Sequence, residues 1–132
     1  MQAEERAVRA FVAPASRDRW LTLLASPKSR RKVTDRLSHF SDWAAGASTP
    51  LRLTGKREEQ LRSLHQALVE RGAGSECHNV CERSPLDGTT RNLLDALDLL
   101  LDDGSAWVIC DPDRLALHLP EMPADPVILS RR

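Results

Sequence analysis

The sequence predicts an α+β fold: N-terminal helices, then a small mixed sheet with helices on one face and a C-terminal β-hairpin. Two observations carry this prediction. Apolar residues recur at helical spacing in the first forty residues and in two later segments. Short segments rich in apolar residues, which are typical of strands, lie between these two later helical segments and after the second of them. Strands that alternate with helices and end in a hairpin are typical of a mixed sheet covered by helices.

Five segments are expected to be helices, because apolar residues recur in them every three or four positions. Proline or glycine follows several of their ends, as Pro14 follows the first and Gly104 the last. Ser26 followed by Pro27 is a typical start for the third. The expected helices span residues 4–12, 17–25, 27–40, 56–71 and 89–102.

Four short segments are expected to be strands. The last two are joined by a turn that begins Asp111-Pro112, which is typical of a type I turn and predicts a hairpin. The segment from Pro120 onwards contains three prolines and is expected to be irregular. The expected strands span residues 51–53, 77–82, 106–110 and 115–119.

Length and composition are those of a globular protein. The chain has 132 residues, of which 41% are hydrophobic and 29% charged, enough to build a core without disulfides or a metal. We expect a single domain over residues 1–132, with a helical part (1–40), an α+β part (51–119) and an irregular tail (120–132). No secretory signal and no membrane-spanning apolar run is visible, and the three cysteines are expected to be free, so a cytoplasmic location is predicted.

The net charge of zero conceals a division between the two halves of the chain. Residues 1–72 contain 14 Lys and Arg against 8 Asp and Glu, whereas residues 73–132 contain 5 against 11. Such asymmetry arises when a basic surface binds an anionic partner, and equally when the two halves attract each other. Both explanations stay open at the level of sequence.

The basic segment 17–36 is the leading candidate for a functional site. Cationic side chains near a helix start can bind phosphate, because they point the same way as the free backbone N–H groups. The alternative is a solvated helix face, since the stripe of Val33, Leu37 and Phe40 requires polar residues on the other side. The candidates for contact with an anionic partner are Arg17, Arg19, Lys28, Arg30, Arg31, Lys32 and Arg36.

Acidic residues near strand ends form an alternative site. Glu82, Asp87 and Asp111 could hold a divalent cation or supply general acid–base catalysis in a small metal-dependent hydrolase. Each also has a local role, because Asp87 precedes a glycine in a loop and Asp111 begins the hairpin turn.

The cysteines are expected to pack in the core and not to bind metal. Three residues separate Cys77 from Cys81, which is one more than a zinc knuckle usually has. On a strand these two cysteines share a face, and His78 points to the other one. Buried cysteine behaves as a small hydrophobic residue. No metal and no cofactor is therefore predicted.

The stretch from Arg19-Trp20-Leu21 to Lys32, followed by Leu37-Ser38-His39-Phe40, resembles the helical opening of a set of small uncharacterised bacterial proteins. The later half is similar too, with a cysteine-containing strand, an Asp-Gly loop at Asp87, an amphipathic helix and a closing hairpin. The chain departs from that set at Ser41-Asp42-Trp43-Ala44, where an Asp-Pro-Arg type of connector is usual. The resemblance implies one domain of bacterial origin and implies no chemistry.

The sequence thus favours a non-enzymatic binding or regulatory protein that contacts an anionic partner, either nucleic acid or protein, through residues 17–36. Few aromatic residues are available to stack on bases, since the chain has two Phe and no Tyr. A protein-interaction subunit is a further alternative, which exposed Trp20, Trp43 or Trp107 would favour. No membrane contact is expected, and whether the chain forms a homo-oligomer stays open.

Overall fold

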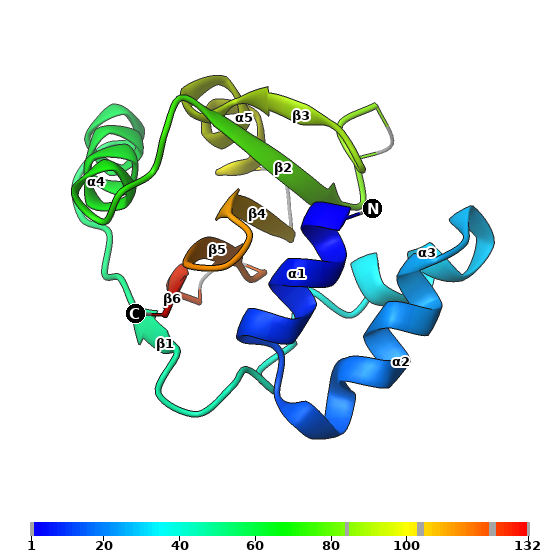
Figure 1. Ribbon diagram of the computed structural model, residues 1–132. Helices are drawn as coiled ribbons and strands as arrows, with labels where there is room; N and C mark the ends of the chain where they lie inside the picture. The colour runs from blue at the N-terminus through cyan, green and yellow to red at the C-terminus, as the bar shows by residue number, and fades with distance from the viewer. Residues whose placement is uncertain (1, 84, 103–104, 122–123, 132) are drawn as a thin grey trace.

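A computed structural model describes residues 2–83, 85–102, 105–121 and 124–131, and within these residues five helices flank a six-stranded sheet (Figure 1). The α+β class predicted from the sequence is confirmed. The helices are α1 (Gln2–Phe11), α2 (Pro14–Leu24), α3 (Pro27–Thr34), α4 (Arg57–Glu70) and α5 (Leu93–Leu100). The strands are β1 (Ser48–Pro50), β2 (Glu76–Cys81), β3 (Thr90–Asn92), β4 (Ala106–Asp111), β5 (Leu115–Leu119) and β6 (Val127–Ser130).

The strand order is β1-β6-β5-β4-β2-β3, and every neighbouring pair of described strands is antiparallel, not mixed. A mixed sheet was expected because helices usually connect neighbouring parallel strands. Here α4 carries the chain from β1 at one edge to β2 near the other edge. The second connection, through α5, joins β3 to β4, which lie on opposite sides of β2. Neither helix joins adjacent strands, so no parallel pair arises.

Three short strands differ from the sequence prediction. β6 lies in the segment expected to be irregular, and it pairs with both β5 and β1. This is compatible with the prolines because Pro126 precedes the strand and so removes no N–H from its ladders. β1 covers residues 48–50 instead of 51–53, and β3 occupies the first residues of the segment expected to be helix 89–102. Both are edge strands of three residues, too short to show an alternating pattern.

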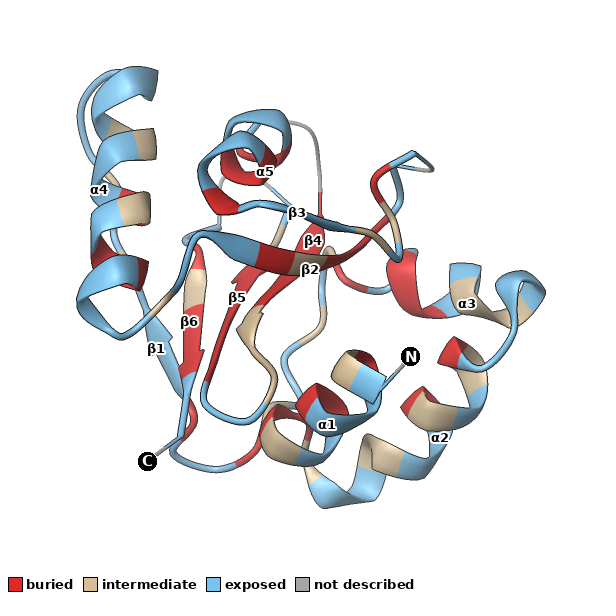
Figure 2. Ribbon diagram, turned by 45° about the horizontal axis from the view of Figure 1, so that its top comes forward, coloured by how far each residue is buried: buried red, intermediate tan, exposed pale blue. Residues whose placement is uncertain are grey.

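Helices cover both faces of the sheet, instead of the single face that was expected. Figure 2 shows buried residues on the sheet strands and on the helix faces that meet them. On one face Leu64 of α4 and Leu97 of α5 pack in a hydrophobic core with Val108 of β4. On the other face Phe11 of α1 belongs to a second core with Trp107, the neighbour of Val108 along the strand. The sheet is therefore the middle layer, and α1, α2 and α3 form an outer layer by themselves.

The start of α5 depends on a side-chain cap. Asn92 is the N-cap residue, and its Oδ1 accepts a hydrogen bond from the backbone N–H of Asp95 at 3.1 Å. We expect Asn92→Ala to lower the free energy of unfolding by about 1 kcal/mol in urea denaturation, the usual effect of removing such a cap. Asn92→Asp, which keeps an accepting oxygen, should retain the stability of the parent. Equal losses in the two variants would contradict this role.

Candidate functional site

The basic residues predicted from the sequence lie on α2, on α3 and in the turn after α3. α3 begins at Pro27 after the cap Ser26, whose Oγ accepts the backbone N–H of Ser29 at 3.3 Å. The helix buries Val33 and Thr34, so the residues on its opposite side face solvent. It ends at Thr34 and not at residue 40 as expected. We call the exposed cations of this region the basic surface: Arg19, Lys28, Arg31, Lys32 and Arg36.

The five cations of the basic surface make no ion pair and no side-chain hydrogen bond within the described part of the chain. Arg17 differs from them, because it is half-buried and its Nε donates to the backbone carbonyl of Val12 at 2.8 Å. The basic surface is therefore free to contact a partner without breaking a contact inside the protein.

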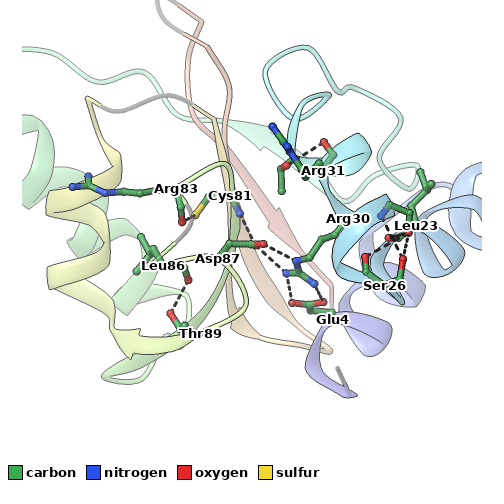
Figure 3. Close-up of polar contacts among 12 residues, drawn as sticks. Glu4, Leu23, Ser26, Arg30, Arg31, Cys81, Arg83, Leu86, Asp87 and Thr89 are labelled. Atoms are coloured by element: carbon green, nitrogen blue, oxygen red, sulfur yellow. Dashed lines mark hydrogen bonds and ion pairs between the residues drawn. The ribbon is translucent and has the colours of Figure 1, made fainter.

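Arg30 also differs from its neighbours, because it points into the protein (Figure 3). Nη1 and Nη2 each donate to an oxygen of Glu4 at 2.6 Å. Nε and Nη2 donate to Asp87 at 2.7 and 3.0 Å. The nitrogen Nε2 of His78 lies 2.6 Å from Glu4 Oε2. We call Glu4, Arg30, His78 and Asp87 the Arg30 cluster; it joins α1, α3, β2 and the loop after β2.

The pair formed by Glu4 and Arg30 keeps both charges at neutral pH. Burial raises the pKa of the Glu4 carboxyl, but hydrogen bonds and charge from Arg30 and His78 outweigh that effect and lower the pKa to about 2. The hydrogen bonds from Arg30 to Glu4 in turn raise the pKa of Arg30, against the opposing effect of its burial. The side chains of Arg30 and Glu4 are 15% and 2% exposed, so the pair is largely shielded from water. Its geometry is that of a bidentate structural ion pair.

Glu4 and His78 were not identified from the sequence as members of a site. A signal for Glu4 was available, because it precedes Ala7, Val8 and Phe11 by three, four and seven residues and so lies on the apolar stripe of α1. His78 was expected on the face of its strand opposite the cysteines, and the structure places it there, against Glu4.

A cleft of about 620 Å³ lies beside the Arg30 cluster, between α3 and the end of β2. It brings two of the three predicted acidic residues, Glu82 and Asp87, together with Arg31 and Cys81. Burial raises the pKa of the Cys81 thiol to about 11, so the sulfur is protonated at neutral pH. Asp87 is engaged by Arg30 and also accepts the backbone N–H of Cys81 at 3.1 Å.

Asp111 does not join the other two acids. Cys81 pairs with Ala106 at the start of β4, and Asp111 lies five residues further along that strand. At the rise of a β-strand this is a separation of about 16 Å. Asp111 Oδ1 instead accepts the backbone N–H of Asp113 at 3.0 Å and so closes the hairpin turn. Among the described residues no group of three acidic, His or Cys side chains could hold a metal ion.

Part of the charge asymmetry is used inside the protein. Arginines of residues 1–72 pair with acids of residues 73–132 at three places. The pairs are Arg6–Asp113, Arg30–Asp87 at 2.7 Å, and Arg57 with both Asp98, at 2.8 Å, and Asp102. The two halves therefore attract each other through these pairs, and the five cations of the basic surface are among those that take no part in them.

The tryptophans form an internal aromatic cluster. Trp20 and Trp107 are 5% and 0% exposed, and their ring centroids are 5.3 Å apart. Trp43 is half-buried and lies 4.6 Å from Phe40 and 5.1 Å from His118. His118 donates from Nε2 to the carbonyl of Leu37 at 2.5 Å, and burial lowers its pKa. Exposed tryptophan, the feature that would favour a protein-interaction subunit, is therefore not seen at these three positions.

The chain matches no family model, no curated protein and no solved structure in the three comparisons made with known proteins. In the described residues no helix has the length and apolarity needed to cross a membrane.

Proposed function

We propose that this chain is a binding protein whose basic surface contacts an anionic partner, with nucleic acid as the partner class that its chemistry favours. The observation that supports the proposal is the exposure of five cations within residues 19–36 whose side chains have no partner among the described residues. α3 itself carries four cations and no acidic residue between Pro27 and Thr34, and the exposed Asp35 follows as its C-cap. A polyanion that meets such a surface releases bound counterions, which is a favourable contribution to binding.

The aromatic residues favour recognition of the phosphate backbone over recognition of bases. Proteins that bind single strands usually stack bases on exposed aromatic side chains. Here Trp20 and Trp107 are buried, and Phe40 and Trp43 pack against each other at 4.6 Å. We therefore expect duplexes to bind at least as well as single strands of equal length, with little dependence on sequence.

Charge reversal on the outer side of α3 tests the proposal. We expect Arg31→Glu/Lys32→Glu to reduce the affinity for nonspecific duplex DNA or RNA at low salt by at least about tenfold, because two phosphate contacts become repulsive. The dependence of log K on log salt should become less steep by about two, since roughly one counterion is released per phosphate contact. Fluorescence anisotropy across a salt series measures both quantities.

The matched control is Arg52→Glu/Arg62→Glu. These two cations are also exposed and unpaired in the described structure. Arg62 lies on α4, which covers the other face of the sheet, and Arg52 lies in the segment between β1 and α4. The control changes the net charge equally and should keep most of the affinity. Equal losses in both variants would show nonspecific attraction and remove the basic surface as the site. If the parent binds neither nucleic acid nor an acidic polypeptide at low salt, the proposal fails.

A further inference from the structure

All three cysteines lie on the same face of the sheet, Cys77 and Cys81 on β2 and Cys110 on the neighbouring strand β4. In the antiparallel ladder between β2 and β4, Asn79 is opposite Val108. In an antiparallel pair, moving two residues back along β2 from Asn79 and two residues forward along β4 from Val108 keeps both positions on the same face. These two positions are Cys77 and Cys110, so the same register places them opposite each other. Cys77 is part of the hydrophobic core beneath α4 and α5, and Cys110 packs against that same core.

Facing positions of an antiparallel ladder have the spacing that a disulfide needs. Their Cα atoms are about 4.5–5.5 Å apart, and disulfides span Cα separations of about 4.4–6.8 Å. The register between β4 and β5 shifts between Ile109 and Asp111, which makes Cys110 the extra residue of a bulge. A bulged residue is not held by both neighbouring ladders, so Cys110 can adjust its position more easily than a residue within a regular strand.

Both sulfurs are thiols in the structure, and they differ in access. Cys77 is buried and its Sγ donates to Asn79 Oδ1 at 3.6 Å, whereas Cys110 is half-buried. Burial raises the pKa of Cys77 to about 11. Burial, with a smaller effect from the charge of Cys77, raises the pKa of Cys110 to about 12. The mutual influence of the two groups agrees with their placement side by side.

We propose that Cys77 and Cys110 form a site of reversible oxidation, at which a hydroperoxide converts the two thiols into a disulfide between β2 and β4. The more accessible sulfur, that of Cys110, attacks the peroxide, breaks its O–O bond and becomes a sulfenic acid, with release of water or an alcohol. The sulfur of Cys77 then attacks the sulfenic sulfur, and the hydroxyl leaves as water. The two thiols together lose two protons and two electrons, which the peroxide takes up as it is reduced to water or to an alcohol and water. An added dithiol reverses the change by thiol–disulfide exchange.

Cys81 supplies a control inside the chain. It is buried on the same face, but it lies four residues from Cys77, which along a strand is about 13 Å. This distance is too long for a disulfide with Cys77. The variant Cys81→Ser therefore keeps the proposed pair and removes the only other thiol.

The experiment treats the folded full-length parent, Cys81→Ser and Cys110→Ser with hydrogen peroxide, alkylates the remaining thiols after unfolding, and maps peptides by mass spectrometry. We expect the parent and Cys81→Ser to lose two alkylatable thiols each and to yield one cross-linked peptide pair that contains residues 77 and 110. Cys110→Ser should yield no intramolecular cross-link. Treatment with dithiothreitol should restore all thiols. At pH values below the thiol pKa, the rate of thiol loss in Cys81→Ser should rise about tenfold for each unit by which the pH is increased. The reason is that the thiolate is the nucleophile and its fraction grows in the same proportion.

Several results would overturn the proposal. One is a parent and a Cys81→Ser variant that keep all their thiols under peroxide. Another is a cross-link that contains residue 81 as the main product. A third is conversion of Cys110 to sulfinic acid without any bond to Cys77. Because the parent and Cys81→Ser both retain the proposed pair, these results decide the question even if Cys110→Ser folds poorly.

Discussion

Replacing Arg30 with methionine should lower the free energy of unfolding by about 3–5 kcal/mol, the usual cost of removing one partner from a buried ion pair. Methionine keeps much of the volume of the arginine stem but donates no hydrogen bond. Glu4, whose side chain is 2% exposed, would lose two charge-assisted hydrogen bonds, and Asp87 would lose two more. Urea denaturation at neutral pH, followed by circular dichroism, measures the change.

The neighbouring residue provides a matched control. Arg31 belongs to the same helix but is exposed and unpaired among the described residues, so Arg31→Met should change stability by only a few tenths of a kcal/mol. A double variant, Glu4→Leu/Arg30→Met, should regain part of the loss, because no carboxylate is then left buried at that position. If Arg30→Met and Arg31→Met are equally stable, the Arg30 cluster does not hold α3 against the rest of the protein.

The contrast between Arg30 and Arg31 shows what the sequence could reveal about the candidate site. Arg30 precedes Val33 and Leu37 by three and seven residues, so helical spacing places it on the apolar stripe of α3. Glu4 has the same relation to the stripe of α1. Two opposite charges on two apolar stripes can be recognised from spacing alone. Their pairing with each other could not, because it depends on how α1 and α3 pack on the sheet.

The fold was predictable where a segment carries its own pattern. α5 and the β4–β5 hairpin have clear periodicity or turn residues, and both were expected near their observed positions. β1 and β3, by contrast, have three residues each, and they form by pairing with the edges of β6 and β2. The antiparallel order and the second helical layer likewise follow from long-range pairing, which local patterns do not encode. Glu82 and Asp111 were grouped as strand-end residues, but they lie at opposite ends of the β2–β4 ladder.

The stability of the protein should fall by about 3 kcal/mol through the titration of Glu4 alone as the pH is lowered from neutral to about 2. The folded-state pKa of Glu4 is about 2 against an ordinary value of 4.5, because Arg30 and His78 outweigh the effect of burial. A lowered pKa means that the unfolded chain takes up the proton first. The contribution of Glu4 is therefore complete above pH 4.5 and is lost as the pH falls through the folded-state pKa.

The variant Glu4→Gln separates this contribution from that of the other carboxyls. Glutamine has nearly the same shape but does not titrate, so the difference in unfolding free energy between parent and variant should be largest near pH 7 and should shrink by about 3 kcal/mol towards pH 2. Asp87→Asn offers a comparison at the more exposed carboxyl of the cluster, whose side chain is 20% exposed. A difference between parent and Glu4→Gln that stays constant across this range would show that Glu4 has the same pKa in the folded and unfolded chain. In that case its contacts with Arg30 would contribute no net electrostatic stability, and the cluster would owe its role to packing.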